Sequence, residues 1–217
     1  MLPKRRGRDD VKYGESTGVE RINGFSDAVF AVAITLLILT IVVPEISDTD
    51  QLGQELADMW PKFMGFLVSF VIIGAFWMNH HGMFTYLRRS TPGLLRINLL
   101  LLMFIVLLPF STDLMSEYDS SVLAATFYNI NMIAVALLMC LLWWYASYYR
   151  DLVDDSVTPA LRRHLLLVYT SMALVFCLSI AIAFISIPAS RYFYLSLIPI
   201  NSLLDHMRRK ESTQADA

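Results

Sequence analysis

The sequence predicts an all-α integral membrane protein whose chain crosses the bilayer six times. Hydrophobic residues make up 56% of its 217 residues and charged residues only 17%, and the mean hydropathy is +0.54. A soluble domain of this length carries roughly a quarter charged residues, so the shortage of charge indicates a protein that lies within a membrane. Several apolar runs also reach the roughly 20 residues that a helix needs to cross a hydrocarbon core.

The expected spans follow one another with short polar connections. They cover residues 22–43, 60–86, 94–115, 122–149, 161–185 and 190–205. The sixth is shorter, begins just after Pro188 and contains Pro199, so it is either a kinked span or an interfacial helix; we favour the span. Residues 1–15 are expected to form a polar cytoplasmic leader, 16–210 a single six-helix membrane domain, and 211–217 a disordered tail.

Lysine and arginine are concentrated on one side of this map. Of the 17 basic residues, only Lys62 and Arg191 fall on the opposite side. The connections on that side carry acids instead: Glu45, Asp48, Asp50, Glu55, Asp58, Asp113, Glu117 and Asp119. Because positively charged residues stay on the cytoplasmic side, this pattern predicts cytoplasmic termini and favours six spans over five.

Polar side chains share one depth near the predicted cytoplasmic side. Asp27 lies six residues inward from Arg21 in the first span. Four more polar groups fall at a similar level: Asn79, His80 and His81 in the second span, and Asn98 in the third. At ~1.5 Å rise per residue these groups occupy a band about 10 Å deep. Since unsatisfied polar groups are costly in lipid, they are expected to form a hydrogen-bonded cluster, although the adjacent His80 and His81 cannot both face it.

Helical phase separates this cluster from an aliphatic stripe on the first span. At ~100° per residue, one face of the helix carries Val32, Thr35, Leu36 and Leu39. Arg21 and Phe25 lie near the azimuth of that stripe, whereas Ser26 and Asp27 project about 120–140° away from it. Ser26 and Asp27 can therefore pack into the subunit's own bundle, while the stripe faces lipid, another helix or a symmetry axis.

Simpler structural roles also fit several of these residues. Ser26 and Asp27 could cap a helix start, Arg21 could extend to the membrane surface, and Thr35 could bond to its own helix backbone. The tryptophans are expected to be interfacial anchors: Trp60, Trp77, Trp143 and Trp144. The histidines lack zinc-ligand spacing, and there are no hydrolytic, phosphate-binding or Cys-x-x-Cys motifs. We therefore expect no enzyme, no cofactor, no bound metal and no nucleic-acid partner.

Three segments of the chain resemble the transmembrane protein 175 family. They are Arg21-x-x-x-Phe25-Ser26-Asp27 with the aliphatic run to Leu37, Phe76-Trp77-Met78-Asn79-His80-His81, and Asn98-Leu99-Leu100-Leu101-Leu102 leading into Leu108-Pro109-Phe110-Ser111. The eukaryotic members are endosomal and lysosomal potassium channels and resemble a duplicated form of this unit. A single copy of six spans is similar to the prokaryotic members, which would assemble as homotetramers.

This resemblance implies a potassium-conducting cation channel in a prokaryotic plasma membrane, with lipid and further copies of the chain as partners. Four first spans would line a central pore, with constrictions at Val32, Leu36 and Leu39 and a polar layer at Thr35. The structural motif would join two sets of residues: Arg21, Phe25, Ser26 and Asp27 with His80 or His81 and Asn98.

The implied mechanism is a hydrophobic gate. The chain has no Thr-Val-Gly-Tyr-Gly filter, and narrow aliphatic rings close a pore by excluding water, so only modest selectivity for K⁺ over Na⁺ is expected. The alternative is a proton-coupled or metal-ion transporter that uses Asp27 with His80 or His81, because intramembrane acid and histidine side chains often mark proton paths.

Overall fold

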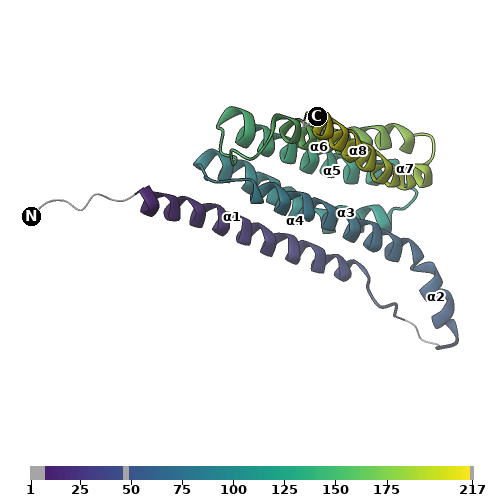
Figure 1. The fold of residues 1–217 in the computed structure, drawn as a ribbon. Helices are drawn as coiled ribbons and strands as arrows, with labels where there is room; N and C mark the ends of the chain where they lie inside the picture. The colour runs from purple at the N-terminus through teal and green to yellow at the C-terminus, as the bar shows by residue number, and fades with distance from the viewer. Residues whose placement is uncertain (1–7, 46–48, 216–217) are drawn as a thin grey trace, which may run out of the picture.

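The computed structural model describes residues 8–45 and 49–215, and that part of the chain is a bundle of helices (Figure 1). The long helices are α1 (Arg8–Leu36), α3 (Trp60–Thr85), α4 (Pro92–Glu117), α5 (Val122–Trp144), α6 (Pro159–Ala183) and α8 (Leu197–Ala215). The short helices are α2 (Leu52–Asp58) and α7 (Ile187–Phe193). The prediction of an all-α protein is therefore confirmed.

Within the described residues, five helical segments are long and apolar enough to cross a membrane. They are Gly18–Thr40, Trp60–Thr85, Pro92–Glu117, Val122–Tyr149 and Pro159–Ala183. Each overlaps one of the first five predicted spans, and the ends differ by a few residues. α1 begins at Arg8 and α8 continues to Ala215. The polar leader and the tail stay predictions, and residues 1–7 and 216–217 of them lie outside the described residues.

The region of the sixth predicted span is divided into pieces. α7 and α8 are separated by the 3-10 turn η4 (Tyr194–Ser196), and within the described residues neither helix meets the length and apolarity of a span. Pro188 lies in the first turn of α7, and Pro199 follows the start of α8. Proline lacks the amide hydrogen that a continuous helix needs, which accounts for the break.

Several helices begin at a hydroxyl side chain followed by proline. Thr91 and Thr158 accept hydrogen bonds from the backbone amides three residues later, both at 3.2 Å. Pro92 and Pro159 then occupy the first helical position, where a missing amide hydrogen costs nothing and the fixed φ suits the helix. These local signals set where α4 and α6 start.

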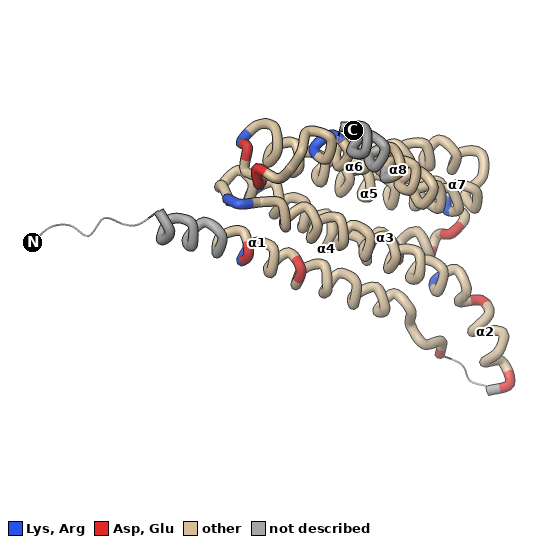
Figure 2. Tube along the Cα trace, viewed as in Figure 1, with Lys and Arg blue, Asp and Glu red and all other residues tan. Residues whose placement is uncertain are grey.

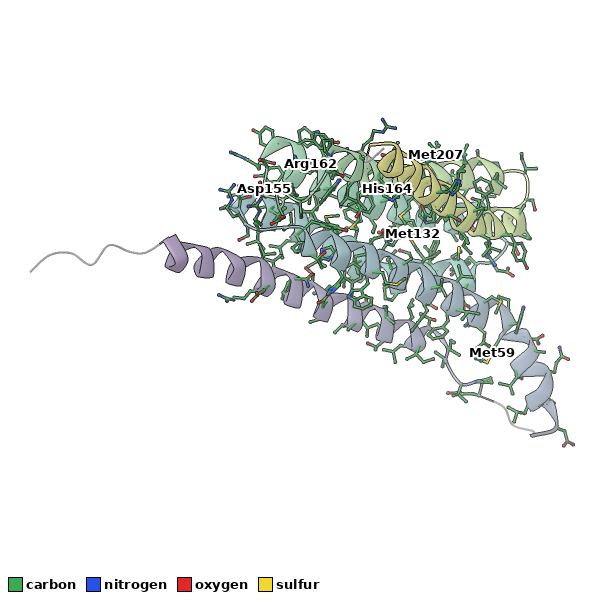
Figure 3. The ribbon with its side chains drawn as sticks, in the orientation of Figure 1. Met59, Met132, Asp155, Arg162, His164 and Met207 are labelled. Carbon is green, nitrogen blue, oxygen red and sulfur yellow. The ribbon has the colours of Figure 1, made fainter. Side chains whose placement is uncertain are left out.

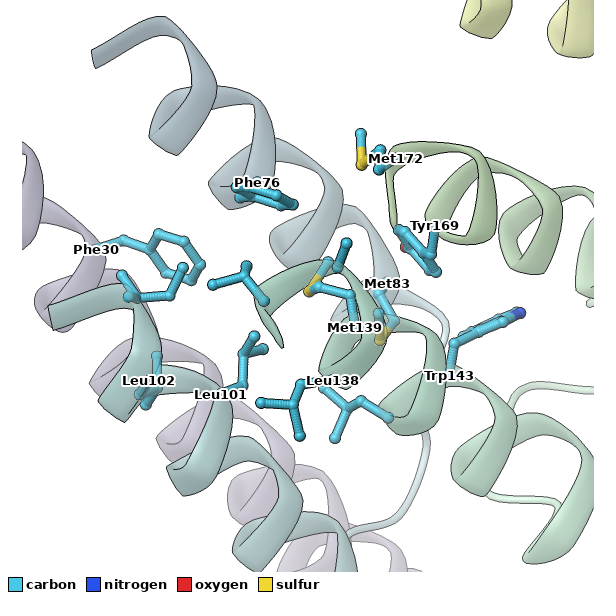
Figure 4. Close-up of a cluster of buried hydrophobic side chains, with 14 of the residues drawn as sticks. Phe30, Phe76, Met83, Leu101, Leu102, Leu138, Met139, Trp143, Tyr169 and Met172 are labelled. Atoms are coloured by element: carbon cyan, nitrogen blue, oxygen red, sulfur yellow. The ribbon is translucent and has the colours of Figure 1, made fainter. Parts of the chain in front are cut away.

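α1 lies along one edge of the bundle, where it packs against α3 and α4 (Figure 1). α5 packs between α4 and α6, and α7 and α8 cover α6. The centre is filled by apolar side chains from several helices (Figure 4), among them Phe30, Phe76, Leu101, Met139 and Tyr169. α1 is thus an edge helix, packed on one side against α3 and α4.

One expected interfacial anchor belongs to this core instead. Trp143 is fully buried, and its indole Nε1 donates a hydrogen bond of 2.9 Å to the carbonyl oxygen of Arg162. Trp144 is exposed, as an interfacial residue would be. Two consecutive helical residues project about 100° apart, so only one of the pair can face the bundle surface.

Charged residues are concentrated at the two ends of the bundle, and its middle carries few of them (Figure 2). At one end the α3–α4 connection is tied to the segment before α6. Leu87 pairs with Val153 in an isolated antiparallel bridge, and Arg88 forms ion pairs of 3.0 Å with Asp154 and 2.5 Å with Asp155. The Asp155 carboxylate raises the pKa of Arg88. Asp155 and Arg162 mark this end, and Met59 marks the opposite end (Figure 3).

Candidate functional site

A buried hydrogen-bonded chain connects α1 to its two neighbours. The Asn98 amide on α4 donates from Nδ2 to Ser26 Oγ on α1 at 2.9 Å. The same amide meets His80 Nε2 on α3 through its Oδ1 at 2.8 Å. All three residues are fully buried. Because a carboxamide oxygen can only accept, His80 Nε2 carries the proton in this arrangement, and we name these three residues the anchor.

Ser26 completes the chain by donating to its own helix. Its Oγ bonds to the carbonyl oxygen of Ile22 at 2.8 Å, so it accepts from Asn98 and donates to the backbone. The His80 ring lies between aromatic neighbours, 4.4 Å from Phe84 and 5.4 Å from Phe30 between ring centroids. The anchor is therefore a polar link set in an apolar layer.

Asp27 lies beside the anchor but outside it. Its Oδ1 accepts a 2.8 Å hydrogen bond from Trp77 Nε1 and lies 3.7 Å from Nδ1 of the exposed His81. Asn23 Nδ2 lies 3.4 Å from the other carboxylate oxygen. The two adjacent histidines thus contact different groups, His80 the buried amide and His81 the half-exposed acid.

The remaining predicted polar residues are not part of the anchor. Arg21 and Phe25 are exposed in the single chain. Asn79 turns back to its own helix, where Nδ2 donates to the carbonyl oxygen of Ala75 at 2.8 Å. Trp77 and Asn23 were missed as partners of Asp27, although Asn23 precedes it by one helical turn, a spacing that places two side chains on the same face.

The aliphatic stripe of α1 faces away from the bundle. Val32 is 53% exposed, Leu36 37% and Leu39 69%, whereas Phe30, Ala33 and Leu37 on the other face are fully buried. Thr35 is exposed, and its Oγ1 donates to the carbonyl oxygen of Val32 at 2.9 Å. α1 consequently has one face that binds its own chain and one that does not.

The end of α1 departs from the regular helix that the phase argument assumed. Residues Leu37–Thr40 form a 3-10 turn, η1, in which side chains three residues apart eclipse one another. Leu39 therefore stands more directly in line with Leu36 than α-helical phase predicts. The stripe becomes straighter at this end of the helix.

Among the described residues, no group of three or more histidine, cysteine, aspartate or glutamate side chains is placed to hold an ion. The anchor offers an amide, a hydroxyl and one imidazole, and the stripe offers aliphatic carbon with one hydroxyl layer. Such a surface can exclude water or let a hydrated ion pass.

Comparison with known proteins places the chain in a family. Residues 21–109 match the model of the family described as endosomal/lysosomal potassium channel TMEM175. A potassium channel of Streptomyces collinus is 37% identical over 172 residues, which cover 77% of this chain and 84% of that protein. A potassium channel of Chamaesiphon minutus is 39% identical over 142 residues, covering 63% and 70%.

A solved structure agrees with these relatives. The crystal structure of a lysosomal potassium-selective channel TMEM175 homolog from Chamaesiphon minutus superposes with a TM-score of 0.76 at 31% sequence identity. The superposition covers 87% of this chain and 98% of that one. Sequence and fold together show that the chain belongs to the TMEM175 family.

Proposed function

We propose that the chain is the subunit of a potassium-conducting cation channel in which four copies of α1 surround a central pore. The observation that carries this proposal is the division of α1 into two faces. Its anchor side is fixed by Asn98 and His80, and its Val32–Leu39 stripe is turned away from the rest of the chain. K⁺ is proposed as the permeant ion because two relatives are described as potassium channels.

The pore would close at aliphatic rings. In a four-fold assembly Val32, Leu36 and Leu39 each supply four side chains to one level, and narrow apolar rings exclude water and stop ions. Thr35 would form the polar layer among them. Its hydroxyl proton is engaged with the Val32 carbonyl, so the oxygen lone pairs stay available to a cation without a change of rotamer.

Only modest selectivity for K⁺ over Na⁺ is proposed, since aliphatic rings do not replace a hydration shell as a carbonyl filter does. Acidic side chains at the opposite end of the bundle would raise the local concentration of cations. Asp50, Asp58 and Asp113 are exposed there, whereas Glu117 is partly neutralised by Lys62 at 2.7 Å.

The sixth crossing would be formed by α7, η4 and α8 together. Ser179 on α6 and Ser190 on α7 are joined through their hydroxyls at 2.7 Å, and α8 packs against α6. Arg191 donates to the carbonyl oxygens of Met115 and Asp119 at the end of α4. These contacts support a broken helix returning through the bilayer, which would leave both termini on the cytoplasmic side of the plasma membrane.

Planar-bilayer recordings of the purified protein test the channel proposal. Single-channel steps with a reversal potential that favours K⁺ over Na⁺ are expected. Saturable flux without steps that disappears in Asp27→Asn would instead support a proton-coupled or metal-ion transporter. A monomer or dimer by native mass measurement would rule out the central pore.

A further inference from the structure

A second candidate site lies at the end of the bundle where the α3–α4 and α5–α6 connections meet. The side chain of Tyr145, the first residue of the π-helical turn η3 (Tyr145–Tyr149), lies over the first turn of α4. A Cβ at Gly93 would collide with the Tyr145 hydroxyl, and Thr91 Oγ1 lies 3.3 Å from that hydroxyl. Tyr145 therefore holds a hydroxyl group at the start of α4.

Two arginines converge on this hydroxyl from different helices. Arg96 is one helical turn after Gly93, so both lie on the same side of α4, and Arg150 ends η3. Gly93 contacts the Tyr145 hydroxyl, and the Arg150 guanidinium lies 5.0 Å from the ring centroid of Tyr149, whose ring is 5.6 Å from that of Tyr145. Both arginines are also exposed to the surroundings of the bundle. Two positive charges therefore lie on the part of the surface around Tyr145.

Two neighbouring arginines of this end are already paired with carboxylates. Arg88 is paired with two aspartates, and Arg162 with Asp151 at 3.0 Å. Among the residues whose side chains the structure describes, no carboxylate pairs with Arg96 or Arg150. Arg150 instead lies over the ring of Tyr149, 5.0 Å from its centroid. The cluster around Tyr145 thus carries two positive charges that no carboxylate among the described side chains pairs with.

The surroundings of the cluster are those of a membrane interface. Trp144 and Tyr149 stack with ring centroids 5.7 Å apart and are 45% and 59% exposed, as in the aromatic belts of membrane proteins. One turn deeper, Leu99 and Leu100 are exposed on the face of α4 that carries Arg96. The charged side chain of Arg96 thus lies directly beside an apolar surface formed by Leu99 and Leu100.

We propose that Arg96, Arg150 and the Tyr145 hydroxyl bind the headgroup phosphate of an anionic phospholipid, with an acyl chain along Leu99 and Leu100. Arginine recognises phosphate through its forked donors, and a tyrosine hydroxyl adds a further donor. A lipid headgroup and free inorganic phosphate would both offer a phosphate anion to this site. The exposed leucines beside it favour the lipid as the source. This inference does not depend on which ion the protein conducts.

Native mass spectrometry of the full-chain protein tests the site. The protein is released from mixed micelles that contain equal amounts of phosphatidylglycerol and phosphatidylcholine with identical acyl chains, and the lipids retained per subunit are counted. Each arginine near an anionic surface contributes about 1 kcal/mol, so Arg96→Gln with Arg150→Gln should weaken phosphatidylglycerol binding about thirtyfold. The double Arg→Lys variant should lose less affinity than the glutamine variant, because it keeps the charge but not the forked donors.

Arg163→Gln is the matched control, because it removes one charge from an exposed residue at the same end of the bundle. It should change lipid retention less than threefold. Tyr145→Phe removes a single hydroxyl and replaces the double variant as the test if that variant does not fold. It should weaken phosphatidylglycerol binding about threefold and leave phosphatidylcholine binding unchanged.

Three results would overturn the proposal. One is equal retention of the two lipids by the wild-type protein. Another is an equal loss in Arg163→Gln and in either arginine variant taken singly, which would indicate surface potential alone. The third is displacement of phosphatidylglycerol by millimolar inorganic phosphate, which would identify a site for a free anion.

Discussion

Replacement of Asn98 by leucine tests the claim that the anchor positions α1. Leucine has nearly the shape of asparagine and leaves no large cavity, but it removes both hydrogen bonds of the amide, to Ser26 and to His80. Ser26 keeps its bond to the Ile22 carbonyl, whereas the hydrogen bond of His80 Nε2 is lost. The change therefore separates polar linkage from packing.

The magnitude follows from the number of bonds. Hydrogen bonds between membrane helices contribute about 0.6 kcal/mol on average and about 1.7 at most. Two such bonds give an expected loss of about 1–3 kcal/mol in the free energy of unfolding. Denaturation of the purified protein by sodium dodecyl sulfate, followed through helical circular dichroism, measures this loss. Bilayer recordings of the same preparation should show an altered open probability.

Asn131→Leu is the control for stability alone. Asn131 is also buried and donates from Nδ2 to Ser111 Oγ at 2.8 Å, a bond that joins α5 to α4 and leaves α1 out. It should cost about half as much stability and leave gating unchanged. Equal changes of open probability in both variants, or unchanged stability and gating in Asn98→Leu, would contradict a role of the anchor in positioning α1.

Two further changes probe the stripe and the packing of α3 on α4. Leu39→Phe should block cation flux in bilayers, and Leu39→Asn should increase leak, because ring width and wetting both change at one level; normal currents in both variants would remove Leu39 from the pore. Gly65→Ala should destabilise the protein by about 1–3 kcal/mol because the new methyl group would collide with Ser116 Oγ. Adding Ser116→Ala should restore most of that stability in the same detergent denaturation, and an equally unstable double variant would contradict the packing argument.

The sequence was sufficient for the broad architecture because length and apolarity are additive properties of a segment. The first five spans needed no knowledge of tertiary contacts. The last segment was different: Pro188 and Pro199 signalled a disturbance, but whether the chain kinks or divides depends on packing against α6. The break at η4 could not be located from composition.

The depth argument predicted that a polar cluster would form, but it identified only some of the residues that are in contact. Depth placed Asp27, His80, His81 and Asn98 together, yet could not say which histidine enters, because adjacent residues differ by about 100° around the helix. That choice depends on how α3 is rotated against α4. Trp77 shows the same difficulty, since an indole near a span end also fits an interfacial anchor, and here it donates to Asp27.

The apolar and the polar contacts of α1 differ in what it costs to break them, and this difference indicates which part of the helix can move. Lipid tails are as apolar as leucine, so exchanging the buried neighbours of Phe30 or Leu37 for lipid costs packing but no hydrophobic free energy. Exposing Ser26 or Asn98 to hydrocarbon would leave polar groups without partners, which is far more costly. We therefore infer that α1 pivots at the anchor. The stripe begins six residues further along, at Val32, so a small rotation there produces its largest displacement at Leu39, where the proposed pore is narrowed by aliphatic carbon alone.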